Sequence, residues 1–245
     1  MGLSAAQYFI TQGAKLIIVG SNPEKVDKAK PILGPSAFCM QGDATKEDTA
    51  DQAIKAAGKN FGGMDGLYHV AGGSGRKWGD GPLHEMSLEG WNQTMLLNLT
   101  SVMLSNRAAI QYFRKQKQSG SILNMGSVLG YSPAPTYFTT HAYATAKSAI
   151  IGYTKSIAAY YAKENIRINV IATALNETPM AERAANDQEI LKYIRTKQPL
   201  DGGRIGDPQD LDLAACYFLS DQSRFTTGQV LSIDGGWALS EGQYE

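Results

Sequence analysis

The sequence has few of the residues that mark disulfide frameworks and metal sites. Its 245 residues include only two cysteines and three histidines. Cys39 and Cys216 are too few for a disulfide framework and lack the spacing of metal ligands. We therefore expect no metal site, and we expect both cysteines to be free thiols that pack as small hydrophobic side chains.

Neither sign of charge is in excess, and long apolar runs are missing. Lys and Arg together number 23, as do Asp and Glu, so no basic surface indicates a nucleic-acid or membrane partner. The apolar runs are far shorter than the ~20 residues that span a bilayer, and the start has no signal-peptide pattern. No Pro/Ser-rich linker divides the chain. We expect a cytoplasmic protein with one domain over residues 1–245, in which residues 176–200 form an inserted substrate loop.

Short apolar runs alternate with longer stretches of helical periodicity. The runs are Leu16–Val19, Ser36–Met40, Gly66–Val70, Ile122–Met125, Ile168–Ile171 and Val230–Ile233. The helical stretches are Gly2–Gln12, Pro23–Ile32, Lys46–Asn60, Leu88–Gln116, His141–Glu164 and Pro208–Leu219. Apolar runs that do not alternate with polar residues are typical of parallel strands covered on both faces. The pattern predicts an α/β fold with a doubly wound parallel sheet of the Rossmann type. Such sheets bind ligands beyond the carboxyl ends of their strands, so we expect the site after Val19, Met40, Val70, Met125 and Ile171.

A tyrosine and a lysine lie four residues apart in the fifth helical stretch. This spacing puts Tyr143 and Lys147 on one face of a helix. A free phenol has a pKa of about 10 and transfers protons poorly at neutral pH. A neighbouring ammonium and a cationic nicotinamide ring would stabilise the phenolate and lower the pKa of Tyr143. Tyr143 is then a candidate general acid or base for a carbonyl or alcohol oxygen, although such pairs are also common on ordinary surface helices.

Two polar residues upstream fit the same chemistry. Ser127 follows the fourth apolar run, where its hydroxyl is placed to donate to the oxygen that Tyr143 protonates. Asn98 lies among leucines, and an amide buried there requires hydrogen-bond partners. Asn98 is either a satisfied core amide or the holder of a water that relays protons to Lys147.

Small residues after two other runs fit a dinucleotide. Ala71 and Gly72 follow the third run and let a cofactor approach the backbone closely. Asp43 and Ala44 follow the second run. The carboxylate of Asp43 accepts a hydrogen bond either from an adenine amino group or from the backbone of the next helix, and the two roles are compatible.

The whole pattern resembles the short-chain dehydrogenase/reductase family. The resemblance rests on an ordered set of motifs along nearly the whole chain: Ala71-Gly72, Asn98, Ser127, Tyr143-x-x-x-Lys147, Thr178-Pro179-Met180, Gly203–Pro208, Leu219–Asp221, Thr227–Val230 and Asp234–Gly236. It implies an oxidoreductase that transfers a hydride between NADP(H) or NAD(H) and a carbonyl or secondary alcohol. It also implies a catalytic tetrad of Asn98, Ser127, Tyr143 and Lys147. In that scheme Tyr143 and Lys147 also contact the cofactor, Lys147 at the nicotinamide ribose, and Thr178 contacts its carboxamide or pyrophosphate side.

The largest departure from the family is at the start. The family opens with a strand and a glycine-rich loop that holds the pyrophosphate at a helix N-terminus, and only Gly2 matches the last step of that loop. The absent strand would lie in the middle of the sheet, between Lys15–Val19 and Gly66–Val70, and would leave a slot of roughly 9–10 Å. We expect this sequence to be part of a longer chain, which an intact mass equal to 26.4 kDa would count against. A chain that lacks this strand is expected to bind the cofactor weakly.

Three further departures concern the site. His69 stands where the family usually has Asn, and we expect hydrogen-bonded scaffolding there rather than a catalyst. Ala172–Leu175 replaces the usual Pro-Gly loop, which weakens the expected backbone contact with the nicotinamide. The segment Tyr131–His141 is longer than usual and is expected to reshape the pocket wall.

The residues after Val19 favour NADP(H) over NAD(H). Ser21 and Asn22 supply a hydroxyl and an amide, Lys25 follows, and no acid at positions 20–22 would repel a 2′-phosphate. We therefore expect Ser21 and Asn22 to bind the cofactor.

The substrate is defined only by class. The loops Ser74–Pro82 and Asn176–Gln198 are expected to border the pocket. Candidates to line it are Trp78, Tyr131, Tyr137, Phe138, Met180 and Tyr193. These side chains either favour an apolar or ring-bearing substrate or simply pack helices together.

The sequence allows two functions to be compared with that of an oxidoreductase. A protein that binds a dinucleotide or a partner without turnover would explain the absent loop and His69, whereas the intact set of polar residues favours catalysis. A serine hydrolase is excluded, because Ser127 is not in a Gly-x-Ser-x-Gly motif.

Assembly is expected from small residues in the fifth helical stretch. Ala142, Ala146, Ala149 and Gly152 would permit close helix packing. The family resemblance implies a homo-oligomer, either a dimer or a homotetramer, with closed symmetry.

Overall fold

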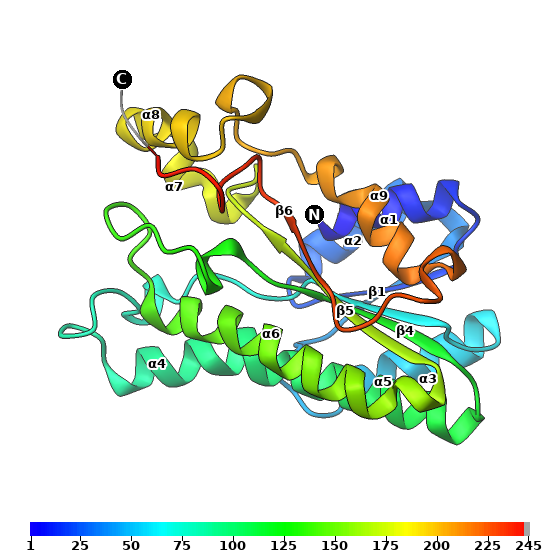
Figure 1. The fold of residues 1–245 in the computed structure, drawn as a ribbon. Helices are drawn as coiled ribbons and strands as arrows, with labels where there is room; N and C mark the ends of the chain where they lie inside the picture. Colours follow the sequence, from blue (N-terminus) through cyan, green and yellow to red (C-terminus); the bar gives the residue numbers. More distant parts are fainter. Residues whose placement is uncertain (243–245) are drawn as a thin grey trace.

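The computed structural model describes residues 1–242, and residues 243–245 of the expected domain lie outside the described part. Parallel strands lie between two layers of helices (Figure 1). The strands are β1 (Leu16–Gly20), β2 (Ala37–Gln41), β3 (Gly66–His69), β4 (Gly120–Met125), β5 (Ile166–Thr173) and β6 (Val230–Ile233). The helices are α1 (Gly2–Thr11), α2 (Pro23–Leu33), α3 (Thr49–Phe61), α4 (Leu88–Met95), α5 (Ser101–Gln116), α6 (His141–Tyr161), α7 (Glu182–Ala185), α8 (Gln188–Lys197) and α9 (Asp212–Leu219). The α/β class and the doubly wound parallel arrangement are confirmed.

Local chemistry accounts for where the helices begin and end. The side chain of Asn22 accepts a hydrogen bond from the Lys25 amide. Pro23 occupies the first position of α2, where its lack of an N–H group leaves no donor unpaired. Ser87 caps α4 in the same way. Gly62 ends α3 with a φ of 86°, a left-handed conformation that favours glycine.

Helix α6 packs closely on the sheet because a stripe of small residues faces it. Ala142, Ala146, Ile150, Thr154 and Ala158 are buried at intervals of four residues, and the helix lies against β5 and beside α4. Ala142 and Ala146 therefore pack inside the protomer, which corrects the expectation that they support assembly.

The sheet is interrupted where the sequence predicted it. β1 pairs only with β2, and β3 begins a separate sheet of order β3-β4-β5-β6. Within residues 1–242, no strand bonds to the edge of β1 that faces away from β2 or to the edge of β3 that faces away from β4. These two edges carry the unpaired backbone groups that the sequence analysis anticipated.

Helix α1 joins the two sheets from one side. Ala6 and Ile10 pack with Val26, Ile18 and other residues of the smaller sheet and α2. Phe9 packs with the larger sheet, where its ring lies 6.2 Å from that of Tyr68 in β3. On the opposite side, α3 contacts both β1 and α5.

The segment expected to be a substrate loop contains two helices. α7 and α8 lie between Asn176 and Gln198, and Asp187 caps α8 by accepting hydrogen bonds from the Glu189 and Ile190 amides. Among the described residues, no helix combines the length and apolar character needed to cross a bilayer.

Candidate active site

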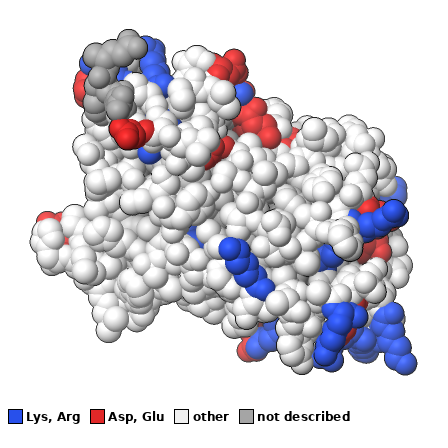
Figure 2. Space-filling model, in the orientation of Figure 1, with Lys and Arg blue, Asp and Glu red and all other residues white. Residues whose placement is uncertain are grey.

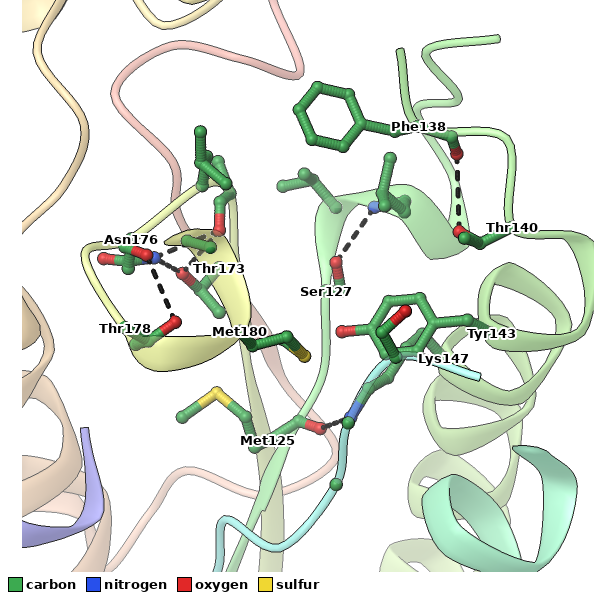
Figure 3. A pocket seen from close by; sticks show the side chains of 18 of the residues that line it. Met125, Ser127, Phe138, Thr140, Tyr143, Lys147, Thr173, Asn176, Thr178 and Met180 are labelled. Carbon is green, nitrogen blue, oxygen red and sulfur yellow. Dashed lines mark hydrogen bonds between the residues drawn. The ribbon is translucent and has the colours of Figure 1, made fainter. Parts of the chain in front are cut away.

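A cavity of about 230 Å³ opens at the carboxyl ends of β3, β4 and β5. Figure 3 shows its two main walls. Tyr143 and Lys147 project from α6 on one side, and Thr173, Asn176, Thr178 and Met180 come from the segment after β5 on the other. The cavity lies where the sequence predicted for the third, fourth and fifth strands. Residues after β1 and β2 do not line it.

Tyr143 and Ser127 meet inside this cavity. Burial raises the pKa of the Tyr143 phenol to about 12, and a hydrogen bond with Ser127 partly offsets that rise. Ser127 is 6% exposed and also accepts a hydrogen bond from the Leu129 amide at 3.3 Å. The sequence analysis expected Lys147 to lower the pKa of Tyr143. In the chain alone this expectation is wrong, because desolvation of the phenolate is the larger effect.

Lys147 is buried beside Tyr143. Its Nζ lies 5.5 Å from the centre of the Tyr143 ring and donates to the Met125 carbonyl at 2.8 Å. Burial lowers the pKa of Lys147 to about 8. An ammonium has three donors, and within residues 1–242 only the bond to Met125 uses one. Two donors are left for groups that enter the cavity.

Asn98 is a satisfied core amide, the first of the two alternatives left open by the sequence. It is fully buried in a π-helical turn between α4 and α5. Its Oδ1 accepts from the Gly73 amide at 3.0 Å, and its Nδ2 donates to the carbonyls of Gly73 and Thr94. Asn98 thereby fixes the loop after β3. A side chain at Gly72 would meet Oδ1 of Asn98 at 2.9 Å, which explains the glycine.

His69 holds the same loop from the other side. Its Nδ1 lies 2.7 Å from the Ser105 hydroxyl, and its Nε2 lies 3.1 Å from the Ala71 carbonyl. A carbonyl only accepts, so Nε2 carries the proton. Burial, with a smaller contribution from Lys147, lowers the pKa of His69 to about 4. The ring is therefore neutral scaffolding, as the sequence predicted.

Asp80 fixes the N-terminus of α6. Its two carboxylate oxygens accept from the amides of Ala142 and Tyr143, at 2.9 and 3.0 Å. Thr140, which directly precedes the helix, makes no capping bond. The sequence analysis missed Asp80, since it lies 63 residues before Tyr143 and its loop has no motif that reveals the contact.

The loop after β5 is held by long-range hydrogen bonds rather than by proline. The buried amide of Gln198 accepts from the Leu175 amide and donates to the Leu175 and Arg204 carbonyls. Gly206 bonds to the backbone of Leu175 and Glu177. Thr173 and Leu175 consequently line the cavity in fixed positions, although the usual Pro-Gly is absent.

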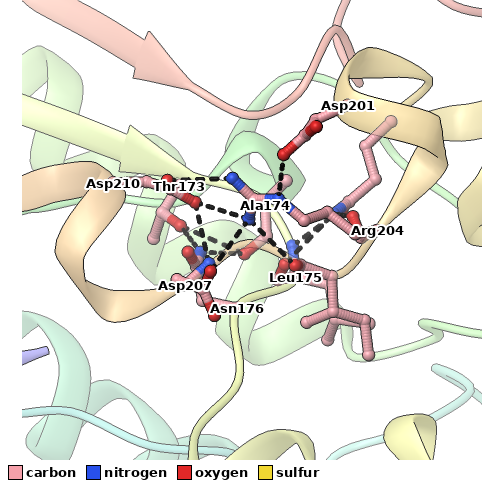
Figure 4. Close-up of polar contacts among 10 residues, drawn as sticks. Thr173, Ala174, Leu175, Asn176, Asp201, Arg204, Asp207 and Asp210 are labelled. Atoms are coloured by element: carbon pink, nitrogen blue, oxygen red, sulfur yellow. Dashed lines mark hydrogen bonds and ion pairs between the residues drawn. The ribbon is translucent and has the colours of Figure 1, made fainter.

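A cluster of charged side chains lies next to the loop that follows β5 (Figure 4). Arg204 pairs with Asp201 at 2.6 Å, with Asp210 at 2.8 Å and with Asp207 at 3.5 Å. Hydrogen bonds from Arg204 and from the Asp207 amide hold the pKa of Asp210 below its usual range. The family-like segment Gly203–Pro208 therefore acts as a structural support in this chain.

The predicted cofactor residues divide into two groups. Gly72, Thr178, Tyr143 and Lys147 line the cavity. Gly2 and Ala71 are the chain neighbours of the lining residues Met1 and Gly72.

The remaining predicted cofactor residues lie beyond the smaller sheet. Ser21 and Asn22 follow β1, and Asp43 and Ala44 follow β2. Asp43 accepts from the amide and hydroxyl of Thr45, so it caps a turn that precedes α3. Those bonds lower the pKa of Asp43.

The expected substrate-lining residues are only partly correct. Phe138 and Met180 line the cavity, whereas Trp78, Tyr131, Tyr137 and Tyr193 do not. Tyr137 and Tyr193 pack their rings together at 5.1 Å instead. The segment Tyr131–His141 does form a wall, through Phe138 and Thr140. The sequence analysis missed the lining residues Arg76, Arg183 and Trp237.

The comparisons with known proteins agree with this geometry. The family described as enoyl-(acyl carrier protein) reductase matches residues 1–238. The inactive 2-(S)-hydroxypropyl-CoM dehydrogenase 2 of Xanthobacter autotrophicus is 31% identical over 235 residues, which are 94% of this chain and 98% of that protein. The 3-oxoacyl-acyl-carrier-protein reductase FabG of Vibrio cholerae is 30% identical, over 96% of this chain and 92% of that protein.

A solved structure has the same fold. The short-chain type dehydrogenase/reductase of Mycobacterium ulcerans is 27% identical, with a TM-score of 0.87, over 98% of this chain and 86% of that one. The chain therefore belongs to the short-chain dehydrogenase/reductase family and is an oxidoreductase that transfers a hydride between a nicotinamide dinucleotide and a carbonyl or alcohol carbon.

Proposed function

We propose that Tyr143 is the general acid and base of this enzyme and that Ser127 binds the substrate oxygen. The observation that carries the proposal is that Tyr143 and Ser127 line the same cavity, where hydrogen bonding by Ser127 favours the Tyr143 phenolate. In carbonyl reduction the carbon gains a hydride and its oxygen gains the proton of Tyr143, which yields an alcohol and the oxidised cofactor. Ser127 donates to the same oxygen as negative charge develops on it.

Lys147 and Thr178 fit the nicotinamide half of the cofactor. The two free donors of Lys147 suit ribose hydroxyls, and Thr178 lines the opposite wall. When bound, the nicotinamide supplies or accepts the hydride. We assign Asn98 and His69 the role of holding the Ala71–Gly73 loop against it.

Electrostatics gives Lys147 a second role. With a pKa of about 12, deprotonation of Tyr143 at neutral pH costs about 7 kcal/mol. Alcohol oxidation needs that phenolate, so it depends on cationic charge close to the ring. The ammonium of Lys147 supplies part of this charge, and an oxidised nicotinamide supplies more.

The test is turnover on a panel of ketones and secondary alcohols, followed by nicotinamide absorbance. We expect the wild type to react, and we expect Tyr143→Phe and Ser127→Ala to lose on the order of 100-fold or more in kcat. Ser127→Ala should keep the wild-type Kd for the cofactor, and Tyr143→Phe should change it far less than it changes kcat. A Tyr143→Phe variant with wild-type kcat would contradict the proposal.

We propose that NADP(H) is preferred over NAD(H). β1 ends at Gly20, and Ser21 and Asn22 lead into the N-terminus of α2. The helix dipole favours an anion at this end, against the opposing charge of Glu24 in the first turn. The Asn22 Oδ1 is engaged in capping α2, which leaves the Ser21 hydroxyl, the Asn22 NH₂ and Lys25 for a 2′-phosphate.

Dissociation constants for the two cofactors test this preference. We expect tighter binding of NADP(H), and we expect Ser21→Asp to reverse the order because a carboxylate repels the phosphate and accepts from the 2′-hydroxyl. A clearly tighter Kd for NAD(H) in the wild type would overturn the preference.

We also propose that the enzyme is a homodimer or homotetramer that acts in the cytoplasm. A shallow groove runs between α5 and α6 and is lined by Met103, Ile110, Tyr153, Ile157 and Tyr161 with three polar residues. Figure 2 shows few charges over α6 on this face, whereas Lys and Arg gather toward the end of α5. Light scattering that gave a monomer mass would remove the oligomer, and fractionation of cells would test the compartment.

A further inference from the structure

Two arginines line a cavity wall that is otherwise mainly apolar. Arg76 comes from the loop after β3, and Arg183 comes from α7. The surrounding lining includes Leu129, Phe138, Met180, Ala184 and Trp237. Figure 3 shows Met180 opposite Tyr143, so this apolar wall faces the catalytic group.

Neither guanidinium is neutralised by the chain. Within residues 1–242 the Arg76 side chain has no hydrogen bond or ion pair, and Arg183 donates only to the Tyr137 carbonyl, at 3.0 Å. The carboxylate nearest to Arg76 in sequence, Asp80, accepts two backbone bonds from α6. Glu182 precedes Arg183 in the chain, but these two described residues form no ion pair with each other. The contrast with Arg204, which pairs with three aspartates, shows that this chain does neutralise other arginines.

The two charges also act on each other. Desolvation and the proximity of Arg183 lower the pKa of Arg76, and the negative charge of Asp80 opposes them. Both side chains are exposed where they line the cavity, so solvent screens much of their repulsion in the empty site. An anion between them removes that repulsion and gains charge-assisted, bidentate hydrogen bonds.

We propose that the substrate carries a carboxylate, which Arg76 and Arg183 bind while its carbonyl or alcohol oxygen lies at Ser127 and Tyr143. The inference deepens the proposed function and rests on it. The cavity of about 230 Å³ is smaller than the ~300–1,000 Å³ of sites for drug-sized ligands. The geometry therefore points to a small oxo acid and the corresponding hydroxy acid.

The cofactor also carries phosphate oxyanions. These phosphates are the alternative source of an anion that Arg76 and Arg183 could bind. Arg76 and Arg183 line the cavity together with Phe138 and Met180, which are expected to contact the substrate, whereas Lys147 and Thr178 are assigned to the cofactor. We therefore favour the substrate, and the experiment measures both ligands.

The first measurement compares an oxo acid with its neutral ester. We expect the wild type to reduce 4-oxopentanoate with a kcat/KM roughly 10- to 100-fold above that of methyl 4-oxopentanoate, as expected for hydrogen bonds to a charged group. Arg76→Met and Arg183→Met should each lower kcat/KM for the acid by about 10-fold and leave the ester within about 3-fold. 4-Oxocyclohexanecarboxylate and its methyl ester provide a second, ring-bearing pair.

Matched controls separate a local role from general charge. Lys77→Met removes a neighbouring cation that lies over the Trp78 ring at 4.2 Å and does not line the cavity. Lys192→Met removes a cation that pairs with Glu189 on α8. Neither should change the ratio between acid and ester. Equal losses on the acid and the ester in the arginine variants, or the same ratio change in the lysine variants, would overturn the proposal.

The last measurement distinguishes the two sources of anion and does not depend on turnover. Calorimetry on Tyr143→Phe with saturating cofactor should show 4-hydroxypentanoate binding that weakens by about 10-fold in Arg76→Met and Arg183→Met backgrounds. The Kd of the cofactor should stay unchanged. A weakened cofactor Kd with an unchanged acid preference would assign the arginines to phosphate. If the wild type binds the acid but does not turn it over, the proposed function is contradicted and the anion site is still supported.

Discussion

Burial of the charged Lys147 side chain lowers the stability of the fold. The proposed role of this charge in catalysis explains why a lysine occupies this position. The side chain is 3% exposed, and burial lowers its pKa to about 8. The unfolded chain therefore binds more protons than the folded chain between pH 8 and pH 10.5, the ordinary pKa of a lysine. The cost is fully present below pH 8 and disappears as the pH rises through this window.

Replacing Lys147 should therefore stabilise the protein while it inactivates the enzyme. At pH 7 we expect Lys147→Met to raise the free energy of unfolding by roughly 1–3 kcal/mol, after loss of the bond to the Met125 carbonyl. Turnover should fall on the order of 100-fold. Urea unfolding measures the first effect, and Lys155→Met, an exposed lysine on the same helix, is the control. A destabilised Lys147→Met would contradict the account.

His69 should make the fold sensitive to acid. Its pKa is lowered from 6.5 to about 4, so the unfolded chain binds the extra proton first as the pH falls. Stability is lost between pH 6.5 and pH 4, by up to about 3 kcal/mol from this residue alone. Unfolding measured across that range should have a flatter pH dependence in His69→Asn, and parallel curves for the two proteins would refute the assignment.

At the scale of elements, the N-terminus of α6 depends on a carboxylate from a distant loop. Asp80 holds the amides of Ala142 and Tyr143 and also complements the positive end of the helix dipole. Asn at this position accepts one fewer bond and carries no charge. We expect Asp80→Asn to lower kcat by about 10-fold and stability by about 1–2 kcal/mol, without a change in the Kd of the cofactor.

A cap on another helix is the matched control for Asp80. Asp187 accepts two amides at the start of α8, and Asp187→Asn should lower stability with little change in kcat. Equal effects of the two substitutions on kcat would mean that Asp80 has no special part in placing Tyr143.

The interrupted sheet should be the least protected part of the strand layer. β1 has one partner strand, whereas β4 and β5 are buried and paired on both edges. Amide exchange in β1 should be faster than in β5 by on the order of 10-fold or more, because fewer hydrogen bonds oppose local opening. Exchange rates from mass spectrometry of peptides that cover the two strands measure this difference. Equal protection would indicate that the inner edge of β1 is paired in solution.

The elements were largely readable from the sequence, and the exceptions have local causes. Uninterrupted apolar runs predicted all six strands, since strands buried on both faces need them. α8 was treated as loop, although Asp187 as a capping residue and the pair Ile190 and Ile194 give a helical signal.

At the scale of the whole molecule, contacts between distant segments could not be predicted from the sequence. Asp80 reaches α6, Gln198 holds the loop after β5, and Arg76 and Arg183 line the same cavity. No periodicity or local motif encodes such pairs. Tyr143 and Lys147 could be proposed because they lie one helical turn apart, and Ser127 because it follows the fourth apolar run. Their hydrogen bonds, and the raised pKa of Tyr143, required the fold.

The residues proposed to bind the two halves of the cofactor follow strands of different sheets. Residues for the adenosine half lie beyond β1 and β2, and residues for the nicotinamide half lie beyond β3 to β5. α1 packs on both sheets and keeps these halves together. A dinucleotide bound across the interruption would therefore couple the smaller sheet to the catalytic one.

The most direct test of the central claim is the rate of a single hydride transfer with cofactor and substrate both saturating. We predict that Tyr143→Phe lowers this rate by on the order of 100-fold or more. Tyr68→Phe, at a half-buried tyrosine of β3 outside the cavity lining, should leave it unchanged. Equal rates in the wild type and Tyr143→Phe would contradict the assignment of proton transfer to this phenol.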